Sequence, residues 1–223
     1  LGIYRFWQKT RLRRYVWSSV DLGGDRFEYT GTGLEKFLGF LLAIVFLAVY
    51  LGLLQLLLFF VGLNVFVDPE TATPTQILRQ VIAIYISFFA VLPFILFAVY
   101  RARRYKLART RWRGIRFGMM KNAWGYVWRA LVFGLVAILS LGILVPLATF
   151  KLEKYLTERS FYGDTRFQQG GSWLDLYRAF IHFPIAAAIL LVAAVLAVAE
   201  LFIPAAVLGG IGYIWIFFAA LHY

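Results

Sequence analysis

Long uninterrupted runs of apolar residues constrain the fold of this chain more than any other feature. A helix of about 20 apolar residues spans the hydrocarbon core of a bilayer, and five runs in the chain reach or approach that length. A soluble fold of this size would leave much of that apolar surface in contact with water. The runs predict transmembrane helices over residues 37–62, 81–100, 130–150, 179–199 and 201–221.

The composition agrees with a membrane protein and narrows the choice of partner. Of the 223 residues, 62% are hydrophobic and 15% are charged, whereas about 25% are charged in a typical soluble domain. The formal net charge is +12. In a soluble protein this excess would suggest nucleic acid. Because the basic residues here adjoin long apolar runs, we expect anionic phospholipid headgroups as the partner and no nucleic acid.

The distribution of charge predicts the topology of the first two helices. Residues 101–121 hold nine Lys or Arg and no acid, and the positive-inside rule places such a segment in the cytoplasm. Residues 64–80 contain one base, Arg79, together with Asp68 and Glu70. This segment is predicted to be a periplasmic loop. The basic N-terminal stretch then lies on the cytoplasmic side.

One short pattern occurs three times along the chain. A tyrosine preceded by several bases is followed eleven residues later by an Arg-Phe pair, with a glycine shortly before the pair. Three occurrences at identical spacing favour duplication over coincidence, although aromatic and basic residues are common here. The three sets are Tyr15, Gly24, Arg26 and Phe27; Tyr105, Gly114, Arg116 and Phe117; and Tyr155, Gly163, Arg166 and Phe167.

A longer match at an offset of 140 residues predicts the organisation into repeats. Leu1-Gly2-Ile3 corresponds to Leu141-Gly142-Ile143, and Arg14-Tyr15 to Lys154-Tyr155. We therefore divide the chain into a first membrane repeat over residues 1–140 and a second over residues 141–223. The second repeat is expected to be C-terminally truncated, and both ends of the chain to be cut from a longer array.

The predicted fold is all-α: a multi-pass transmembrane helical protein with internal tandem repeats and basic amphipathic segments in the headgroup layer. The third apolar run leaves two topologies open. If residues 130–150 span the membrane fully, the third copy lies outside the cytoplasm and the duplication is inverted. If Gly142 and Pro146 break the helix, the run is re-entrant and all copies are cytoplasmic. Length favours the full span.

The repeated motifs resemble those of the YjgN-like family of bacterial inner-membrane proteins, a domain of unknown function. The resemblance implies a bacterial inner (cytoplasmic) membrane location and a repeated architecture. It implies no catalytic or binding residues. The third copy departs from the pattern, with Gln168-Gln169-Gly170-Gly171 where the first has Glu28-Tyr29-Thr30-Gly31. The motifs that carry the resemblance are Leu1-Gly2-Ile3-Tyr4, Trp7, Arg14-Tyr15 and residues 24–33, echoed around Tyr105 and Tyr155.

The repeated residues are the leading candidates for a lipid-contacting site. Each arginine of the motif could hold a phospholipid headgroup while the phenylalanine dips into the acyl boundary and the tyrosine lies at the interface. The alternative is structural, with arginine capping carbonyl groups or pairing with Asp25 or Asp164. The candidate interfacial residues are Arg26, Phe27, Arg116, Phe117, Arg166, Phe167, Tyr15, Tyr105 and Tyr155.

Polar side chains inside the apolar runs are the second group of candidates. Gln55 lies deep in the first run, where an interhelical hydrogen bond is its commoner role. Glu200 separates the last two runs and is expected in a tight surface turn before Pro204, although a buried position would make it a candidate for proton coupling. His182 and His222 lack acidic neighbours at metal-ligand spacing, and there are no cysteines. We predict no metal, no cofactor and no catalytic residues.

Three classes of function remain after this reading. The favoured one is a non-enzymatic scaffold or accessory protein that contacts anionic lipid or a partner complex. Such a protein could form a homo-oligomer or belong to a larger membrane complex. The alternative is a small-solute transporter or channel built from repeats, which would require a midplane cavity lined by Gln55. A lipid-modifying enzyme would need clustered acids, histidines or a metal at the interface, and the sequence has no such cluster.

Overall fold

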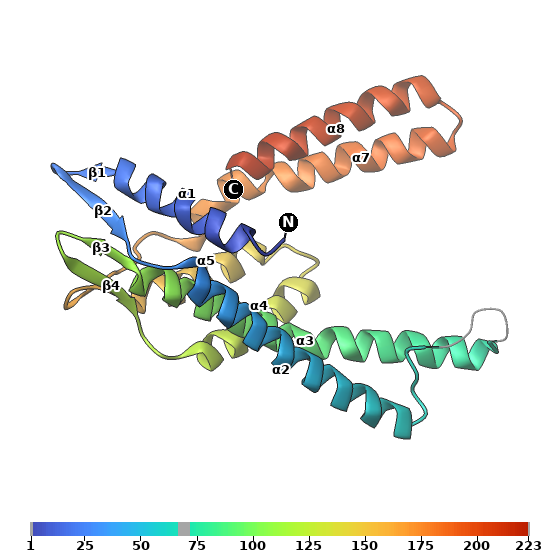
Figure 1. The fold of residues 1–223 in the computed structure, drawn as a ribbon. Coiled ribbons are helices and arrows are strands. Elements are labelled where there is room, and N and C mark those ends of the chain that lie inside the picture. The colour runs from blue at the N-terminus through green and yellow to red at the C-terminus, as the bar shows by residue number, and fades with distance from the viewer. Residues whose placement is uncertain (1, 67–71, 223) are drawn as a thin grey trace. The chain divides into compact units, whose positions relative to one another are not determined.

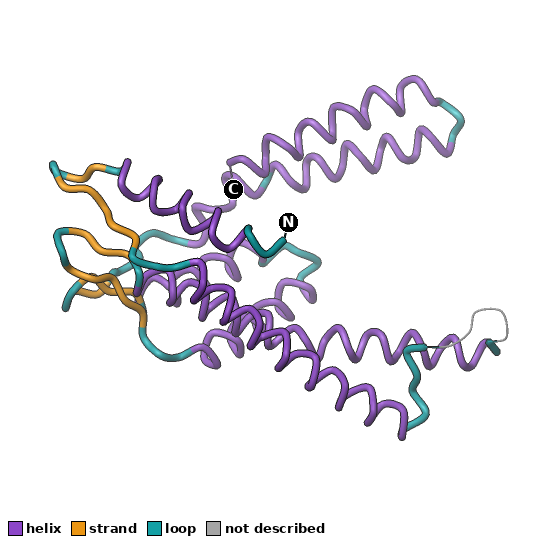
Figure 2. The backbone as a smooth tube through the Cα atoms, viewed as in Figure 1, coloured by secondary structure: helices purple, strands orange, loops and turns teal. Residues whose placement is uncertain are grey.

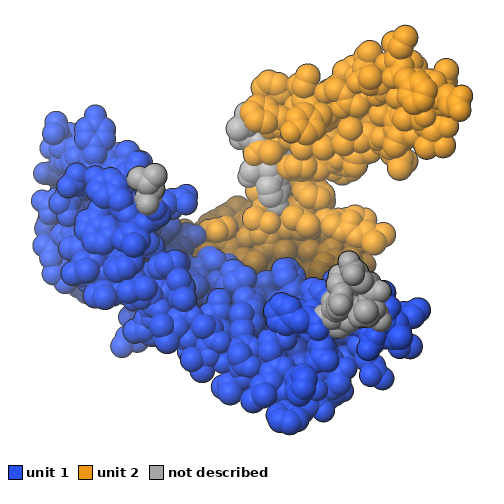
Figure 3. Space-filling model, turned by 45° about the vertical axis from the view of Figure 1, so that its right-hand side comes forward, with its two compact units in different colours: residues 1–128, 158–167 blue, residues 129–157, 168–223 orange. Residues whose placement is uncertain are grey.

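The computed structural model of the chain describes residues 2–66 and 72–222. It divides into two compact units, one formed by residues 1–128 with 158–167 and the other by residues 129–157 with 168–223 (Figure 3). Each unit is described by itself below. Asp68 and Glu70, on which the periplasmic assignment partly depends, lie outside the described residues.

Two long helices, α2 (Gly33–Phe60) and α3 (Pro74–Ala108), form the apolar part of the first unit. Both are long and apolar enough to cross a membrane, and almost none of their apolar surface is buried within the protein. At 1.5 Å per residue the helices measure about 42 Å and 52 Å. Two hydrogen bonds join them, from Gln55 Nε2 to Ser87 Oγ at 2.8 Å and from the Tyr50 hydroxyl to the Ala90 carbonyl at 3.3 Å.

Helix α3 corrects the sequence prediction at both of its ends. The predicted loop over residues 64–80 is too long, because α3 already begins at Pro74, which follows the N-cap residue Thr73. Proline is favoured in the first helical turn, where its missing N–H group costs no hydrogen bond. At the other end, the basic residues from Arg101 to Lys106 continue the apolar helix without a break. This basic segment therefore extends α3 rather than forming a separate helix in the headgroup layer.

A six-stranded antiparallel sheet corrects the prediction of an all-α fold. Its strands follow one another in chain order and form three hairpins, which appear in orange in Figure 2. Strands of two to five residues are too short to show a clear period-two pattern in a basic, aromatic sequence. The strands are β1 (Asp21–Leu22), β2 (Asp25–Tyr29), β3 (Thr110–Trp112), β4 (Ile115–Met119), β5 (Ser160–Tyr162) and β6 (Thr165–Arg166).

Each hairpin turns through two residues, and the turn explains the glycine of the repeated pattern. Gly24 and Gly114 have φ of +85° and +74°, and Gly163 has φ of +56°. Two-residue hairpin loops require positive φ, which glycine adopts at no steric cost. At the second turn Arg113 precedes Gly114 and also has a positive φ of +50°.

The same order of elements surrounds each hairpin. A helix with basic residues leads into it: α1 (Arg5–Ser19), the end of α3, and α5 (Val145–Glu158). A polar residue seventeen positions after the repeated tyrosine then accepts a backbone hydrogen bond at the start of the next helical segment. These residues are Thr32, bonded from Glu35 N; Asn122, from Gly125 N; and Ser172, from Leu174 N.

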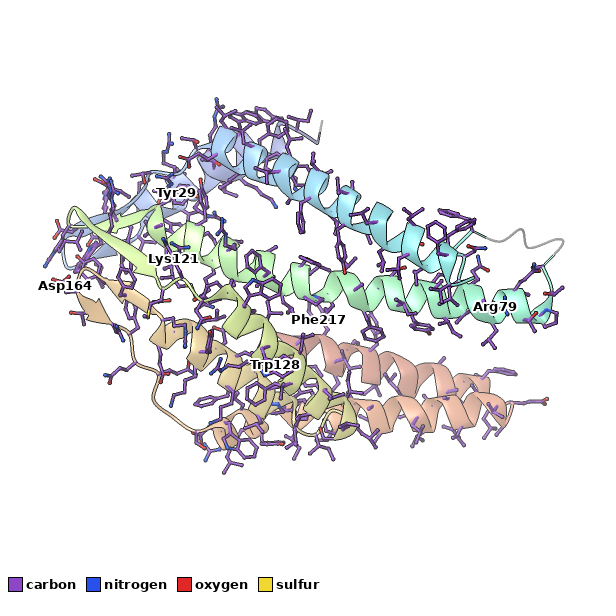
Figure 4. All side chains as sticks on the ribbon, turned by 90° about the horizontal axis from the view of Figure 1, so that it is seen from below. Tyr29, Arg79, Lys121, Trp128, Asp164 and Phe217 are labelled. Atoms are coloured by element: carbon purple, nitrogen blue, oxygen red, sulfur yellow. The ribbon has the colours of Figure 1, made fainter. Side chains whose placement is uncertain are left out.

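Within unit 1 the sheet lies at one end of α2 and α3, with its turns directed away from their apolar stretches (Figure 1). Figure 4 shows Tyr29 at the sheet end and Arg79 at the far end of α3. The buried residues of this unit include Tyr100 in α3, Met119 in β4, and Tyr126 and Val127 in α4. The Tyr100 hydroxyl donates to the Met120 carbonyl at 2.7 Å, which ties the end of β4 to α3.

The third apolar run does not form one continuous helix, and the choice between a full span and a re-entrant path remains a prediction. Helix α4 (Ala123–Leu139) ends before a turn, and α5 begins at Val145. Leu141 and Gly142 have φ of +52° and +87°, and the Gly142 N–H bonds to the Ala137 carbonyl, as expected of a helix C-terminus. Helix α4 follows β4 and α5 leads into β5, so both helices connect to one sheet. The predicted repeat boundary at residue 140 falls in this turn.

The rest of unit 2 is a helical hairpin reached through a short 3-10 turn (Trp173–Leu176) and α6 (Tyr177–Phe180). Helices α7 (His182–Val198) and α8 (Phe202–His222) pack along each other. A Cβ atom on Gly212 would come within 2.9 Å of Leu190, so this glycine permits close packing. These bounds agree closely with the predicted runs.

Candidate functional site

The register of the sheet divides its side chains into two faces. Successive residues of a strand point to opposite sides, and residues paired across strands share a side. Phe27 pairs with Trp112, and Phe117 with Tyr162. Arg111 pairs with Arg116 on the other side. We call these the aromatic face (Phe27, Trp112, Phe117, Tyr162 and Phe167) and the arginine face (Arg26, Arg111, Arg116 and Arg166).

The aromatic face joins the three hairpins through their repeated phenylalanines. The Phe27 and Phe117 ring centroids lie 6.1 Å apart, and those of Phe117 and Phe167 lie 6.2 Å apart with an interplanar angle of 1°. The Tyr162 ring lies 4.8 Å from Phe117. Its hydroxyl donates to the Trp112 carbonyl at 2.9 Å. The phenylalanines of the motif therefore form one stack, with Phe117 at its centre.

In this arrangement the arginine and the phenylalanine of each predicted lipid-contacting motif lie on different faces of the sheet. Arginine and phenylalanine are adjacent in each strand, so they point to opposite faces of the sheet. One motif cannot place its guanidinium on a headgroup and its ring in the acyl region beside it. Contact of either face with lipid remains a prediction.

The arginine face is largely open and unpaired. Arg26, Arg116 and Arg166 are exposed and Arg111 is half-buried. Within residues 2–66 and 72–222, none of the four makes a side-chain ion pair. The Nε atom of Arg111 is buried without a hydrogen-bond partner. The alternative pairing of Arg26 with Asp25 is not formed, because Asp25 accepts from Arg113 Nε at 2.6 Å.

The three repeated tyrosines lie in different surroundings. Tyr15 is 72% exposed, whereas Tyr155 is 5% exposed and lies beneath the guanidinium of Arg129 at 4.6 Å. The Tyr105 hydroxyl donates to Glu35 at 2.7 Å, and Arg109 contacts the other oxygen of the same carboxylate at 2.6 Å. Burial, and then the hydrogen bond to Glu35, raise the pKa of Tyr105 above its usual value. The three tyrosines therefore make different contacts although they occupy equivalent positions in the repeated pattern.

A second group of basic residues surrounds Tyr29 at the base of the sheet. The Lys36 Nζ atom lies 5.2 Å and the Arg13 guanidinium 5.4 Å from the centre of the Tyr29 ring, within cation-π range. Desolvation, and then the charges of Arg13 and Arg103, lower the pKa of Lys106. We call Arg13, Lys36, Arg103 and Lys106 the basal cluster.

The intramembrane candidates have ordinary structural surroundings. Gln55 makes the interhelical hydrogen bond to Ser87 described above. It also lines a depression whose other lining residues, within the described part of the chain, come from α2 and residues 63–66. Glu200 is exposed, with φ of +60°, in the turn between α7 and α8. Among the described residues, no group of three His, Asp or Glu could hold a metal ion.

Comparison with known proteins assigns the family. A family model described as "Bacterial protein of unknown function (DUF898)" matches residues 1–214. The chain belongs to this family. The DUF898 match covers the three hairpins, all of α7 and the first part of α8, as far as residue 214.

A curated relative gives the same result. The inner membrane protein YjgN of Salmonella typhimurium (strain LT2) is 26% identical to this DUF898 chain over 152 residues. The match covers 67% of the chain and 33% of the relative, so the chain spans about a third of that protein's length. The resemblance to the YjgN-like family is thereby confirmed. No solved structure matches the chain.

Sequence reasoning missed several residues of both basic sites. Arg111 lies outside the repeated pattern, and its position opposite Arg116 follows only from the register of the hairpin. The signal was present, because a two-residue turn at Arg113-Gly114 fixes that register. Lys36 in α2 and Lys106 in α3 are 70 residues apart in the sequence. No local pattern predicts that both lie near Tyr29.

Proposed function

We propose that this chain is a multi-pass inner membrane protein without enzymatic activity, which holds its sheet as a scaffold on the cytoplasmic side. The observation that carries the proposal is the single sheet formed by three hairpins at one end of α2 and α3. The relative's name supports the membrane assignment. The nine bases of residues 101–121 adjoin or belong to the sheet, which supports the cytoplasmic side.

The three segments are, in this proposal, copies of one duplicated unit. Each consists of a basic helix, a two-residue hairpin and a polar residue that begins the next helical segment. The equal spacing from tyrosine to turn and from tyrosine to cap supports this view. The stack of equivalent phenylalanines supports it as well.

All three copies would then lie on the same side of the membrane, with residues 130–150 forming a re-entrant helical hairpin. The chain has no cysteine, so single cysteines can report sidedness. With R26C, R116C and R166C in spheroplasts, we expect an impermeant maleimide to react only after the membrane is permeabilised. N64C, at the opposite end of α2, should react in intact spheroplasts. Reaction of R166C in intact spheroplasts would restore the inverted topology.

The basal cluster is the part of the scaffold that we assign to anionic lipid. Lys36 immediately precedes the apolar stretch of α2. Lys106 lies six residues beyond Tyr100, or about 9 Å along the helix. The headgroup layer is about 5–8 Å thick on each side of the hydrocarbon core, and a lysine side chain reaches back into it. Arg13 and Lys36 lie over the Tyr29 ring and Lys106 lies near it, so the cluster offers a phosphate several charged donors.

Replacing the basal cluster is expected to remove the preference for anionic lipid. Bromine-labelled phosphatidylglycerol quenches tryptophan on contact, and Trp17 lies next to Arg13 at 5.9 Å. In detergent micelles, R13Q/K36Q/K106Q should weaken the binding of this lipid, measured by quenching, about a hundredfold, because each of the three bases contributes about 1 kcal/mol near a surface. Quenching by brominated phosphatidylcholine should not change.

The matched control is R26Q/R116Q/R166Q, which removes the same charge from the arginine face. It should retain the preference for phosphatidylglycerol. If this variant lost the preference while the basal variant kept it, the assignment to the basal cluster would be wrong and the repeated arginines would be the lipid site.

A further inference from the structure

The arginine face places like charges directly opposite each other on neighbouring strands, which is unfavourable in a sheet. Arg111 and Arg116 are directly paired across β3 and β4, which brings their Cβ atoms to about 5 Å. Like charges placed opposite each other destabilise a sheet. Two carboxylates share the face, Asp21 opposite Arg26 and Glu28 opposite Arg111, but in the part of the chain that the structure describes neither forms an ion pair with the four arginines.

From this arrangement we infer that the arginine face is a docking site for an acidic peptide segment of a partner protein. The inference deepens the proposed scaffold role and rests on it. Guanidinium groups present forked donors that match carboxylates. A bound carboxylate between Arg111 and Arg116 would relieve their repulsion.

The size of the face fits a linear partner better than a single small anion. From β2 to β6 there are four inter-strand spacings, or about 19 Å. Arg26 lies at the β2 end and Arg166 at the β6 end. An extended peptide of six residues covers a similar length, about 20 Å. Several spaced carboxylates can therefore be bound at once, whereas one phosphate would need converging arginines.

Lipid is disfavoured for this face by its distance from the apolar helices. Arg104 bonds to the Met119 carbonyl and lies about 6 Å beyond Tyr100 along α3. Arg116 is three strand residues further toward the turn, which adds about 10 Å. The total of about 16 Å exceeds the headgroup layer. The basal cluster, not the arginine face, is at the right level for phosphatidylglycerol.

Nucleic acid is disfavoured because the face lacks a stacking platform. Single strands bind grooves in which aromatic rings stack with bases. The aromatic rings of this sheet lie mainly on the opposite face. Phe161 shares the arginine face, but its ring covers Gly118 so closely that a Cβ atom there would collide with it. That ring is already packed against the sheet.

The test uses the full chain in nanodiscs of zwitterionic lipid and a fluorescent peptide of alternating Glu and Ser. We expect saturable binding by fluorescence anisotropy, weakened about tenfold by R111Q/R116Q, which corresponds to about 1.4 kcal/mol. K9Q/R79Q removes the same charge from an exposed position of α1 and from the far end of α3, and should bind as the unmodified protein does. A Lys and Ser peptide should not bind.

Two outcomes would overturn the inference: unchanged binding of the Glu and Ser peptide to R111Q/R116Q, or tighter binding of an oligouridylate of equal charge. R26Q/R166Q, which removes the outer arginines, gives an independent measure if the first variant does not fold. The cysteine test of sidedness does not depend on this peptide. If the unmodified protein failed to bind the Glu and Ser peptide while the cysteine test gave the expected sidedness, the docking site would be refuted and the scaffold would not.

Discussion

Replacing Tyr100 with alanine is expected to lower the free energy of unfolding by about 3–5 kcal/mol, the usual cost of deleting a buried aromatic ring. The Tyr100 side chain is fully buried, and its ring lies 5.7 Å from that of Tyr126. Its hydroxyl holds the Met120 carbonyl at the junction of β4 and α4. The substitution therefore removes both packing and a hydrogen bond where α3 meets the sheet.

The measurement is thermal unfolding of the purified protein in detergent. For a chain of this size the loss corresponds to a fall in Tm of roughly 6–20 °C. Y100F keeps the ring and should cost only about 1–3 kcal/mol, because it leaves the Met120 carbonyl without its donor. Y85A is the matched control, since Tyr85 lies in the same helix but is 60% exposed. Equal effects of Y100A and Y85A would contradict the role assigned to Tyr100.

Replacing Phe117 with alanine is expected to be the second most damaging change and to lower the free energy of unfolding by about 2–4 kcal/mol. Phe117 contacts Phe27, Phe167 and Tyr162, and aromatic pairs contribute about 0.5–1.5 kcal/mol each beyond the burial of their surface. Because this ring links the three hairpins, its loss should also expose their turns to protease. Unfolding in detergent and limited proteolysis measure the two effects.

Two comparisons separate this structural role from contact with lipid. F88A removes a phenylalanine that is 65% exposed in α3 and should change stability by no more than about 0.5 kcal/mol. A double-mutant cycle between F27A and F117A should give a coupling energy of about 0.5–1.5 kcal/mol. If F117A left stability unchanged but weakened lipid quenching, the original expectation of a ring in the acyl boundary would be correct.

Local features of the sequence predicted a large part of the helical architecture. The lengths of the apolar runs located α2, the apolar part of α3, α7 and α8, because a helix forms from its own hydrogen bonds and its length is visible in one segment. Gly142 marked the place where the third run breaks, although length alone had favoured a span. In each of the three copies of the repeated spacing, the glycine lies in a two-residue turn and the arginine in a strand.

The sheet was missed because its strands satisfy their hydrogen bonds with segments far away in the chain. Tyr29 pairs with Thr110, and Met119 with Ser160. A strand of three residues has little stability or pattern of its own. Only the assembled sheet shows that Arg26 and Phe27, neighbours in sequence, serve different faces.

The sequence by itself determined that this chain has helices suited to a membrane, a basic segment beside them and a pattern repeated three times. These properties depend on hydrophobicity, charge and spacing within single segments. The tertiary structure decided that the three patterns build one sheet, that their phenylalanines stack and that Arg111 faces Arg116. The single sheet and the phenylalanine stack depend on contacts between residues 50 to 93 positions apart, which no local pattern encodes, whereas the pairing of Arg111 with Arg116 follows from the short turn between β3 and β4.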